Sequence, residues 1–97
     1  MTVGILPGNE RAAANRHVSV PIATGLGYAR NCVIVNTADV LIAIAGGYGT
    51  LSEIGFALKS GKPVIGLETH DIPDVIRAAS AEQAVELALK HGAARVP

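Results

Sequence analysis

The sequence predicts an α/β fold of three layers, in which helices cover both faces of a mostly parallel β-sheet. Residues 40–44 and residues 63–67 are continuous apolar runs, the pattern of strands that are covered on both faces. A glycine-rich turn and a helical repeat lie between the two runs, so the segment is expected to form a βαβ unit of about thirty residues. Hydrophobic residues make up 49% of the chain and charged residues 16%, a composition that fits a globular domain and excludes disorder.

The chain opens with a predicted strand and loop. Residues 3–6 form a short apolar run that ends at a Pro-Gly pair, the punctuation of a strand that leads into a loop. Residues 9–16 are polar or alanine and lack capping residues, so we expect a loop or a single helical turn. Residues 18–22 alternate weakly and contain a proline, which predicts a short edge strand.

Residues 27–36 allow two interpretations. The β-branched residues 33–35 favour a strand, whereas the apolar positions 26, 29 and 33 have helical spacing. We predict a helix for this segment.

The second half of the chain has a clearer pattern. Residues 40–44 are predicted to be a central parallel strand, and the turn at residues 46–49 leads into a helix that Thr50 is expected to cap. Lys59 and Gly61 are expected to close that helix before the strand at residues 63–67.

A last helix is predicted near the C-terminus. Residues 80–83 read Ser-Ala-Glu-Gln, a capping box, and the helix is expected to run to about Lys90. Residues 74–78 are a candidate terminal strand. Because the sequence contains no internal repeat, linker or low-complexity segment, residues 1–97 are interpreted as a single domain.

Charge and composition restrict the class of ligand. Eight basic and eight acidic residues cancel, so the sequence carries no electrostatic footprint for a nucleic acid or an anionic membrane. No apolar run is long enough to cross a membrane, and the first residues have no signal-peptide pattern, which favours a cytoplasmic protein with a small ligand. Cys32 is the only cysteine, which fits a reducing compartment.

The glycine-rich turn has the chemistry of an anion site. A strand, a turn and a helix N-terminus in that order expose backbone N–H groups at the positive end of the helix dipole. Gly46, Gly47 and Gly49 allow the backbone to take positive φ angles and to approach a phosphate without a Cβ in the way, and Thr50 can offer its hydroxyl group. Tyr48 could stack on the ligand or merely shield the loop.

The turn has three other interpretations, of which one is excluded and two remain open. It could be a tight turn with nothing bound. A Walker A motif is excluded because the Gly-Lys-Ser/Thr ending is missing. A dinucleotide fingerprint, with Glu68 as the ribose-binding acid at the end of the next strand, is a weaker alternative.

Residues 45–53, Ala-Gly-Gly-Tyr-Gly-Thr-Leu-Ser-Glu, resemble the PGGxGTxxE signature of LOG-type (LONELY GUY) proteins, once labelled lysine decarboxylases. Arg30, Asp39 and residues 62–64 (Lys-Pro-Val) also match that family in register. Within it, residues 3–8, 23–27 and 29–31 look more like the branch that contains molybdenum-cofactor carrier proteins.

This resemblance implies a Rossmann-like fold that is truncated at its N-terminus, because family members carry a further βαβ half before the strand that resembles residues 3–6. A partial nucleotide-binding domain would leave apolar faces uncovered, which predicts a homo-oligomer, a dimer or higher.

The resemblance also implies a function. The carrier branch binds a phosphorylated pterin, and our leading hypothesis is a binding protein for such a cofactor or for a nucleotide such as AMP, with no further cofactor required. The LOG enzymes hydrolyse the N-glycosidic bond of cytokinin or adenosine 5′-monophosphates, and a phosphoribohydrolase is the alternative. A degenerate fragment with only an assembly role is a further alternative. Lysine decarboxylation is rejected because no lysine has a suitable setting for pyridoxal phosphate.

The implied site residues fall into two groups. If the hydrolase activity is retained, Glu53 would stabilise the ribose cation or activate water, and Arg30 would orient the phosphate or base. The implied ligand-binding residues are Gly46, Gly47, Tyr48, Gly49 and Thr50, with Thr24 and Gly25 as a second wall of the pocket.

Several of these residues have a simpler structural interpretation. Glu53 could close a capping box with Thr50, and Arg30 could be an ordinary solvated arginine. Asn31, Ala45 and Ser52 depart from the LOG signature, which weakens the enzyme hypothesis. His17, His70 and His91 lie far apart in the sequence, so we predict no metal site and expect these histidines at the surface.

Overall fold

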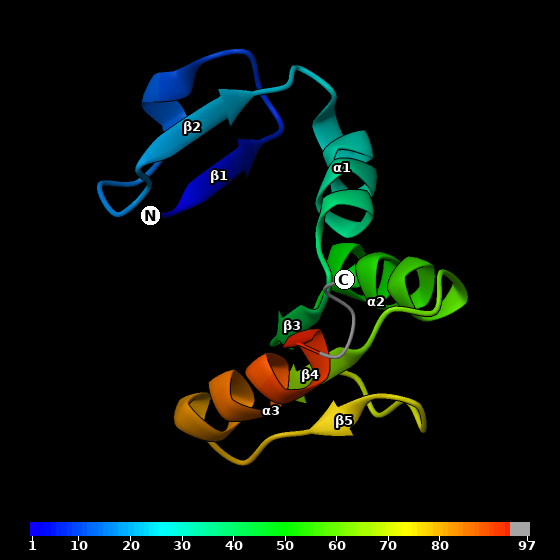
Figure 1. The fold of residues 1–97 in the computed structure, drawn as a ribbon. Coiled ribbons are helices and arrows are strands. Elements are labelled where there is room, and N and C mark those ends of the chain that lie inside the picture. The colour runs from blue at the N-terminus through cyan, green and yellow to red at the C-terminus, as the bar shows by residue number, and fades with distance from the viewer. Residues whose placement is uncertain (94–97) are drawn as a thin grey trace. The chain divides into compact units, whose positions relative to one another are not determined.

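A computed structural model describes residues 1–93 and divides the chain into two compact units (Figure 1). The first unit comprises residues 1–36 and the second begins at Thr37. Every strand pair in both units is parallel, and the structure is therefore of the predicted mixed α/β class.

The first unit is built on a two-stranded sheet. Strand β1 (Val3–Leu6) pairs in parallel with β2 (Val20–Ala23), and the 3₁₀ helix η1 (Arg11–Ala13) lies in the connection between them. A parallel pair needs a connection of a dozen or more residues, which explains the long excursion between the strands. The predicted loop or helical turn is confirmed there.

The predicted edge strand is also confirmed. Pro21 lies within β2 and cannot donate a hydrogen bond, which is tolerated because, among residues 1–93, β2 has a strand on one side only. After β2 the chain passes through a second 3₁₀ helix, η2 (Gly27–Ala29), into α1 (Arg30–Thr37). The helical spacing, and not the β-branched run at residues 33–35, therefore decided the local structure.

The second unit contains the predicted βαβ unit. Strand β3 (Leu41–Ile44), helix α2 (Tyr48–Lys59) and strand β4 (Val64–Leu67) follow one another, and β5 (Ile76–Arg77) and α3 (Ala81–Ala93) complete the unit. The strand order is β3-β4-β5, so β4 is the central strand.

The expectation that residues 40–44 form a central strand is wrong for the sheet that the structure describes. Leu41 and Ala43 are buried, but Ile42 and Ile44 on the opposite face remain 39% and 61% exposed. An apolar run indicates that a strand has hydrophobic side chains on both faces, but it does not indicate which strands or helices cover those faces.

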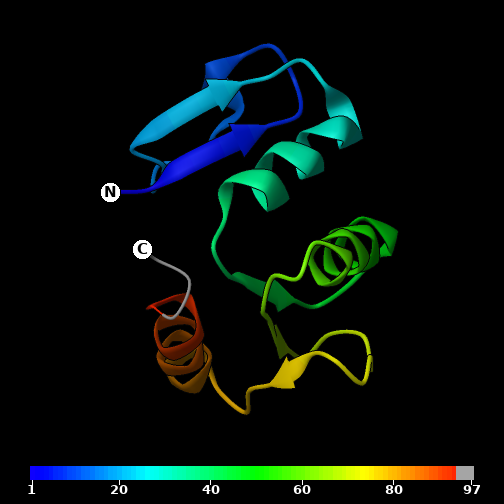
Figure 2. The ribbon, with the colours of Figure 1, turned by 45° about the vertical axis from the view of Figure 1, so that its right-hand side comes forward.

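The core of the second unit lies on both faces of β4. Val64 and Ile65 are adjacent, so their side chains point to opposite faces, and both are fully buried. Helices α2 and α3 flank the sheet on opposite sides in Figure 2, and Ile54 and Ala84 are their buried contributions. The predicted layering of helices on both faces is present within this unit.

The predicted helix ends have the expected chemistry at two places. Gly61 follows α2 with φ 76°, a left-handed conformation that glycine adopts without strain. At α3 the Ser80 hydroxyl oxygen accepts a hydrogen bond from the Gln83 N–H at 3.1 Å, while Gln83 Oε1 accepts from the Ala79 N–H at 2.6 Å. The capping box is thus confirmed, with its return bond shifted by one residue.

Among residues 1–93, no helix is both long enough and apolar enough to cross a membrane.

Candidate functional site

The candidate site lies at the carboxyl ends of β3 and β4 in the second unit. These strands are parallel and in register, with Ile44 opposite Leu67, so the loops that follow them start side by side. Ligands of open α/β sheets bind outside this edge of the strands. The structure therefore brings the predicted glycine loop next to residues 68–70, a segment in which the sequence analysis considered only Glu68 as a ligand-binding residue.

Both loops begin with a residue in a strained conformation. Ala45 has φ 54° and Glu68 has φ 49°, and each directly follows the last paired residue of its strand. A non-glycine residue in this region costs of the order of 1–3 kcal/mol, and such residues cluster at functional sites. A proline could not adopt the Ala45 conformation, because its ring holds φ near −65°.

The loop glycines do not use the positive φ angles that glycine allows. The positive-φ glycines of the described chain are Gly25, Gly27 and Gly61, and the left turn after β3 is made by Ala45 instead. At position 46 the His70 ring comes so close that an added Cβ would lie 2.6 Å from His70 Nε2, and a larger residue would displace the ring. At Gly47, in contrast, no heavy atom would lie within 4 Å of an added Cβ.

Helix α2 begins without a side-chain cap. Its N-cap residue is Gly47, which corrects the expectation that Thr50 caps the helix and that Glu53 closes a capping box. The helix begins at Tyr48, three residues earlier than a helix capped by Thr50 would, so Thr50 occupies the first turn. The prediction was wrong because residues 47–49 read Gly-Tyr-Gly, which has low helix propensity, and yet Tyr48 and Gly49 are already helical.

The start of α2 presents a run of unused backbone donors. In the described chain, no acceptor is hydrogen-bonded to the backbone N–H groups of residues 46–50, and Leu51 is the first residue whose N–H bonds back, to the Gly47 carbonyl at 3.1 Å. Residues 46–48 are exposed and residues 49 and 50 are partly buried. Free N–H groups at the positive end of a helix dipole are suited to an anion.

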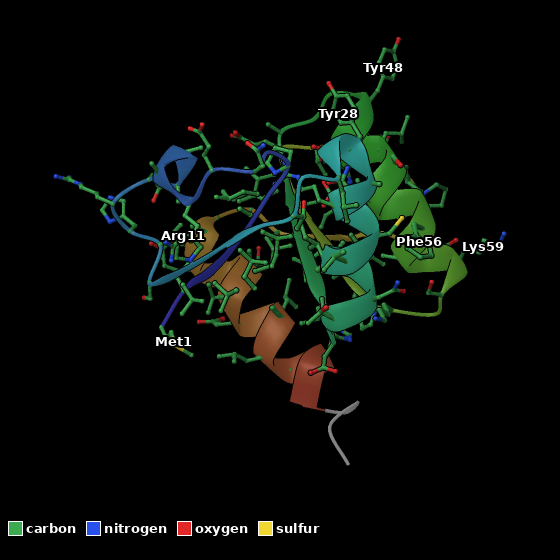
Figure 3. All side chains as sticks on the ribbon, turned by 90° about the horizontal axis from the view of Figure 1, so that it is seen from above. Met1, Arg11, Tyr28, Tyr48, Phe56 and Lys59 are labelled. Atoms are coloured by element: carbon green, nitrogen blue, oxygen red, sulfur yellow. The ribbon has the colours of Figure 1, made fainter. Side chains whose placement is uncertain are left out.

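Two side chains frame this loop on α2. Tyr48 is 89% exposed and its side chain points away from helix α2 (Figure 3). Glu53 is partly buried and, at spacings of four and three residues, lies on the helix face of Gly49 and Thr50. Within residues 1–93 the Glu53 carboxylate has no hydrogen-bond or ion-pair partner.

The loop after β4 supplies two residues that sequence reasoning missed. His70 Nε2 lies 3.2 Å from the Gly47 carbonyl oxygen, and the Thr69 hydroxyl group is buried without a hydrogen-bond partner. His70 was expected only as a surface residue, but it is partly buried against the glycine loop. The usable signal was its position three residues beyond a predicted parallel strand, next to the loop of the neighbouring strand.

The other predicted site residues belong to the first unit. The Thr24 hydroxyl group donates to the Leu6 carbonyl oxygen at 2.6 Å and accepts from the Leu26 N–H at 3.2 Å. The Gly25 N–H bonds the Gly8 carbonyl oxygen at 2.8 Å. Thr24 and Gly25 thus fasten the end of β2 to the end of β1, and the hydroxyl proton of Thr24 is already used.

Arg30 is anchored within the same unit. Its Nη1 donates to the Ile5 carbonyl oxygen at 2.6 Å, and it lines a pocket of about 270 Å³ with Pro7, Gly27 and Tyr28. One bond uses only part of the guanidinium group, which carries five N–H donors. Arg30 is therefore fixed in orientation and retains donors for a ligand.

Metal ligation has no support in the described part of the chain. No group of three or more His, Cys, Asp or Glu side chains lies close enough together to hold a metal ion.

Comparison with known proteins gives the chain a family context. The model of the SLOG cluster4 family matches residues 1–95. An uncharacterized protein of Archaeoglobus fulgidus is 47% identical over 68 residues, which are 70% of this chain and 44% of that protein.

Two solved structures resemble the chain over most of its length. The molybdenum cofactor binding protein of Rippkaea orientalis has a TM-score of 0.83 and 40% identity, over 93% of this chain and 61% of that one. The molybdenum cofactor carrier protein of Chlamydomonas reinhardtii has a TM-score of 0.76 and 33% identity, over 95% and 61%. The chain thus spans less than two thirds of the length of each of these three proteins.

Proposed function

This chain belongs to the SLOG cluster4 family, and from that premise we propose that it binds a phosphorylated pterin or a nucleotide through the N-terminus of α2. The observation that carries this proposal is the run of unused N–H groups at residues 46–50. These donors, in a parallel α/β sheet, are a general solution for binding a phosphate group.

The first part of the proposal concerns the phosphate. The N–H groups at the start of α2 would donate to its oxygens, and the helix dipole would favour its charge. Gly47 supports this role because its Cβ position is open, which leaves room for an oxygen atom close to the backbone. Thr50 would add its hydroxyl group from the first turn of the helix.

The second part concerns the ring system of the ligand. Exposed Tyr48 offers an aromatic face on which a pterin or a purine can stack. The names of the two solved relatives, which are molybdenum cofactor proteins, favour the pterin. The cofactor would be the cargo of this site, held by residues 46–50, and not a group with which the chain performs chemistry.

Gly47→Ala tests this proposal against a matched control. Gly47 has φ −94°, which alanine tolerates, so the variant should fold; its methyl group would occupy the space of the phosphate and weaken binding of AMP at least tenfold. Gly55→Ala is the control, because Gly55 lies on the same helix and its Cβ position is also open. Titration calorimetry measures both affinities.

The outcomes of this titration separate the possibilities. Loss of affinity in Gly47→Ala with unchanged affinity in Gly55→Ala supports the site. An unchanged affinity in Gly47→Ala removes residues 46–50 from it. If the wild-type chain binds neither AMP nor inorganic phosphate, the proposed function is wrong.

A second candidate function rests on Glu53. A partly buried carboxylate without a partner, on the helix face of the proposed phosphate site, has the placement of a group that stabilises a ribose cation or activates water. If the chain is a phosphoribohydrolase, it releases adenine from AMP, and Glu53→Gln lowers the rate at least a hundredfold. Glu86→Gln, on exposed α3 surface, is the control. An equal rate in Glu53→Gln would end this assignment.

A further inference from the structure

His70 is in direct contact with the loop that leads into α2. Its Nε2 atom lies 3.2 Å from the carbonyl oxygen of Gly47. A carbonyl oxygen can only accept a hydrogen bond, so Nε2 must carry the hydrogen in this contact. The same carbonyl also accepts the first helical bond of α2, from the Leu51 N–H. Gly47 is thus held from two sides.

The imidazole ring also packs against the preceding glycine. A Cβ built on Gly46 would lie 2.6 Å from His70 Nε2 and 2.8 Å from His70 Cδ2, closer than such atoms can approach. A side chain at residue 46 would therefore displace the ring. Contact with two consecutive residues fixes the ring on the loop more closely than a single hydrogen bond would.

The geometry of the peptide bond links this contact to the anion site. In a trans peptide the carbonyl of one residue and the N–H of the next lie in one plane and point in opposite directions. A hydrogen bond that fixes the Gly47 carbonyl therefore also fixes the direction of the Tyr48 N–H. Two adjacent glycines have many backbone conformations available, so a contact from another segment can select one of them.

We propose that His70 is a positioning residue of the anion-binding loop, which orients the Gly47–Tyr48 peptide so that the free N–H groups face the ligand. This inference rests on the proposed function, because it assigns His70 a role in that same site. His70 acts through the backbone of Gly47, and no contact with the ligand is required of it.

Two substitutions separate the hydrogen bond from the bulk of the side chain. His70→Gln keeps an N–H donor on a side chain of similar reach, whereas His70→Leu keeps apolar volume and removes the donor. His17→Leu, an exposed histidine of the first unit, controls for the loss of a histidine as such. Inorganic phosphate is the probe, with affinity measured by titration calorimetry and melting temperature recorded for each full-length variant.

The expected result is a difference between the two variants at equal stability. His70→Leu should bind phosphate about fivefold more weakly, the effect of losing one ordinary hydrogen bond, while His70→Gln and His17→Leu stay within about twofold of the wild type. The melting temperatures of His70→Leu and His70→Gln should agree, because the bond lies at an exposed position.

Other results overturn the inference in distinguishable ways. Equal affinities in wild type, His70→Leu and His70→Gln would remove His70 from the site and leave the proposed function intact. Equal weakening in both His70 variants would assign the histidine to packing alone. Absence of phosphate binding in the wild type would overturn the proposed function and this inference together.

Discussion

Ala45 is the residue at which backbone strain and the candidate site meet. Its left-handed conformation lets the chain leave β3 and enter the glycine loop, with the Ala45 N–H still bonded to the Leu67 carbonyl oxygen at 3.3 Å. The Cβ of alanine is unfavourable there, whereas glycine would adopt the same angles freely. The strain therefore comes from the Cβ of Ala45, and glycine at this position would form the same turn without strain.

Ala45→Gly is expected to stabilise the protein for this reason. The free energy of unfolding should rise by about 1 kcal/mol, which urea denaturation would measure. Ala88→Gly, the same substitution inside α3, should lower it by about 0.5–1 kcal/mol, because glycine is a poor helix former. A loss of stability in Ala45→Gly would show that the backbone angle of residue 45 is not as described.

The two longer helices, α2 and α3, differ in whether side chains cap the backbone N–H groups at their N-termini. Helix α3 has a serine cap and a glutamine return bond, so the Gln83 N–H in its first turn and the Ala79 N–H just before it have side-chain partners. Helix α2 has a glycine cap and leaves its first donors free. An element with a purely structural role is expected to be capped, and the contrast favours a ligand at α2.

Ser80→Ala tests the cap of α3. The substitution removes the hydroxyl oxygen that accepts from the Gln83 N–H, and it should lower the free energy of unfolding by about 1 kcal/mol. Ser52→Ala, on the exposed surface of α2, should be neutral or slightly stabilising because alanine is the better helix former. Both changes can be measured by urea denaturation, and equal effects would contradict the assignment of Ser80 as a cap.

For the whole molecule, the main feature is the amount of apolar surface that the described chain leaves uncovered. Ile42 on β3 and Val85 and Leu89 on α3 line an open groove of about 370 Å³, and Leu89 is 69% exposed. Parallel strands are normally covered on both faces, and a two-stranded sheet is marginal by itself. We therefore propose, as expected from the sequence, that the chain self-associates.

Leu89→Glu should weaken this self-association. Sedimentation equilibrium should give an average mass above that of the monomer for the wild type and a mass closer to the monomer for the variant, because burying a carboxylate in an apolar interface is costly. Leu26→Glu, at an exposed loop leucine of the first unit, is the control. Equal masses in Leu89→Glu and wild type would exclude the α3 face from the contact.

The sequence by itself determined the order of the elements and the position of the glycine loop. Continuous apolar runs, helical spacing and the capping box at Ser80 are local patterns, and the structure places strands and helices where these patterns predict them. The family resemblance was likewise carried by residues that are close together in the sequence, and the match to the family model confirms it.

Only the tertiary structure decided how the loop is held. Three features follow from contacts between the loops after β3 and β4. Ala45 adopts a left-handed backbone conformation, the His70 ring packs where a side chain of residue 46 would lie, and the first N–H groups of α2 have no partner in the described chain. These loops are more than twenty residues apart in the chain, and the parallel pairing of their strands brings them together. A local pattern cannot encode such a contact, because it records which residues neighbour each other in sequence and not which strands pair.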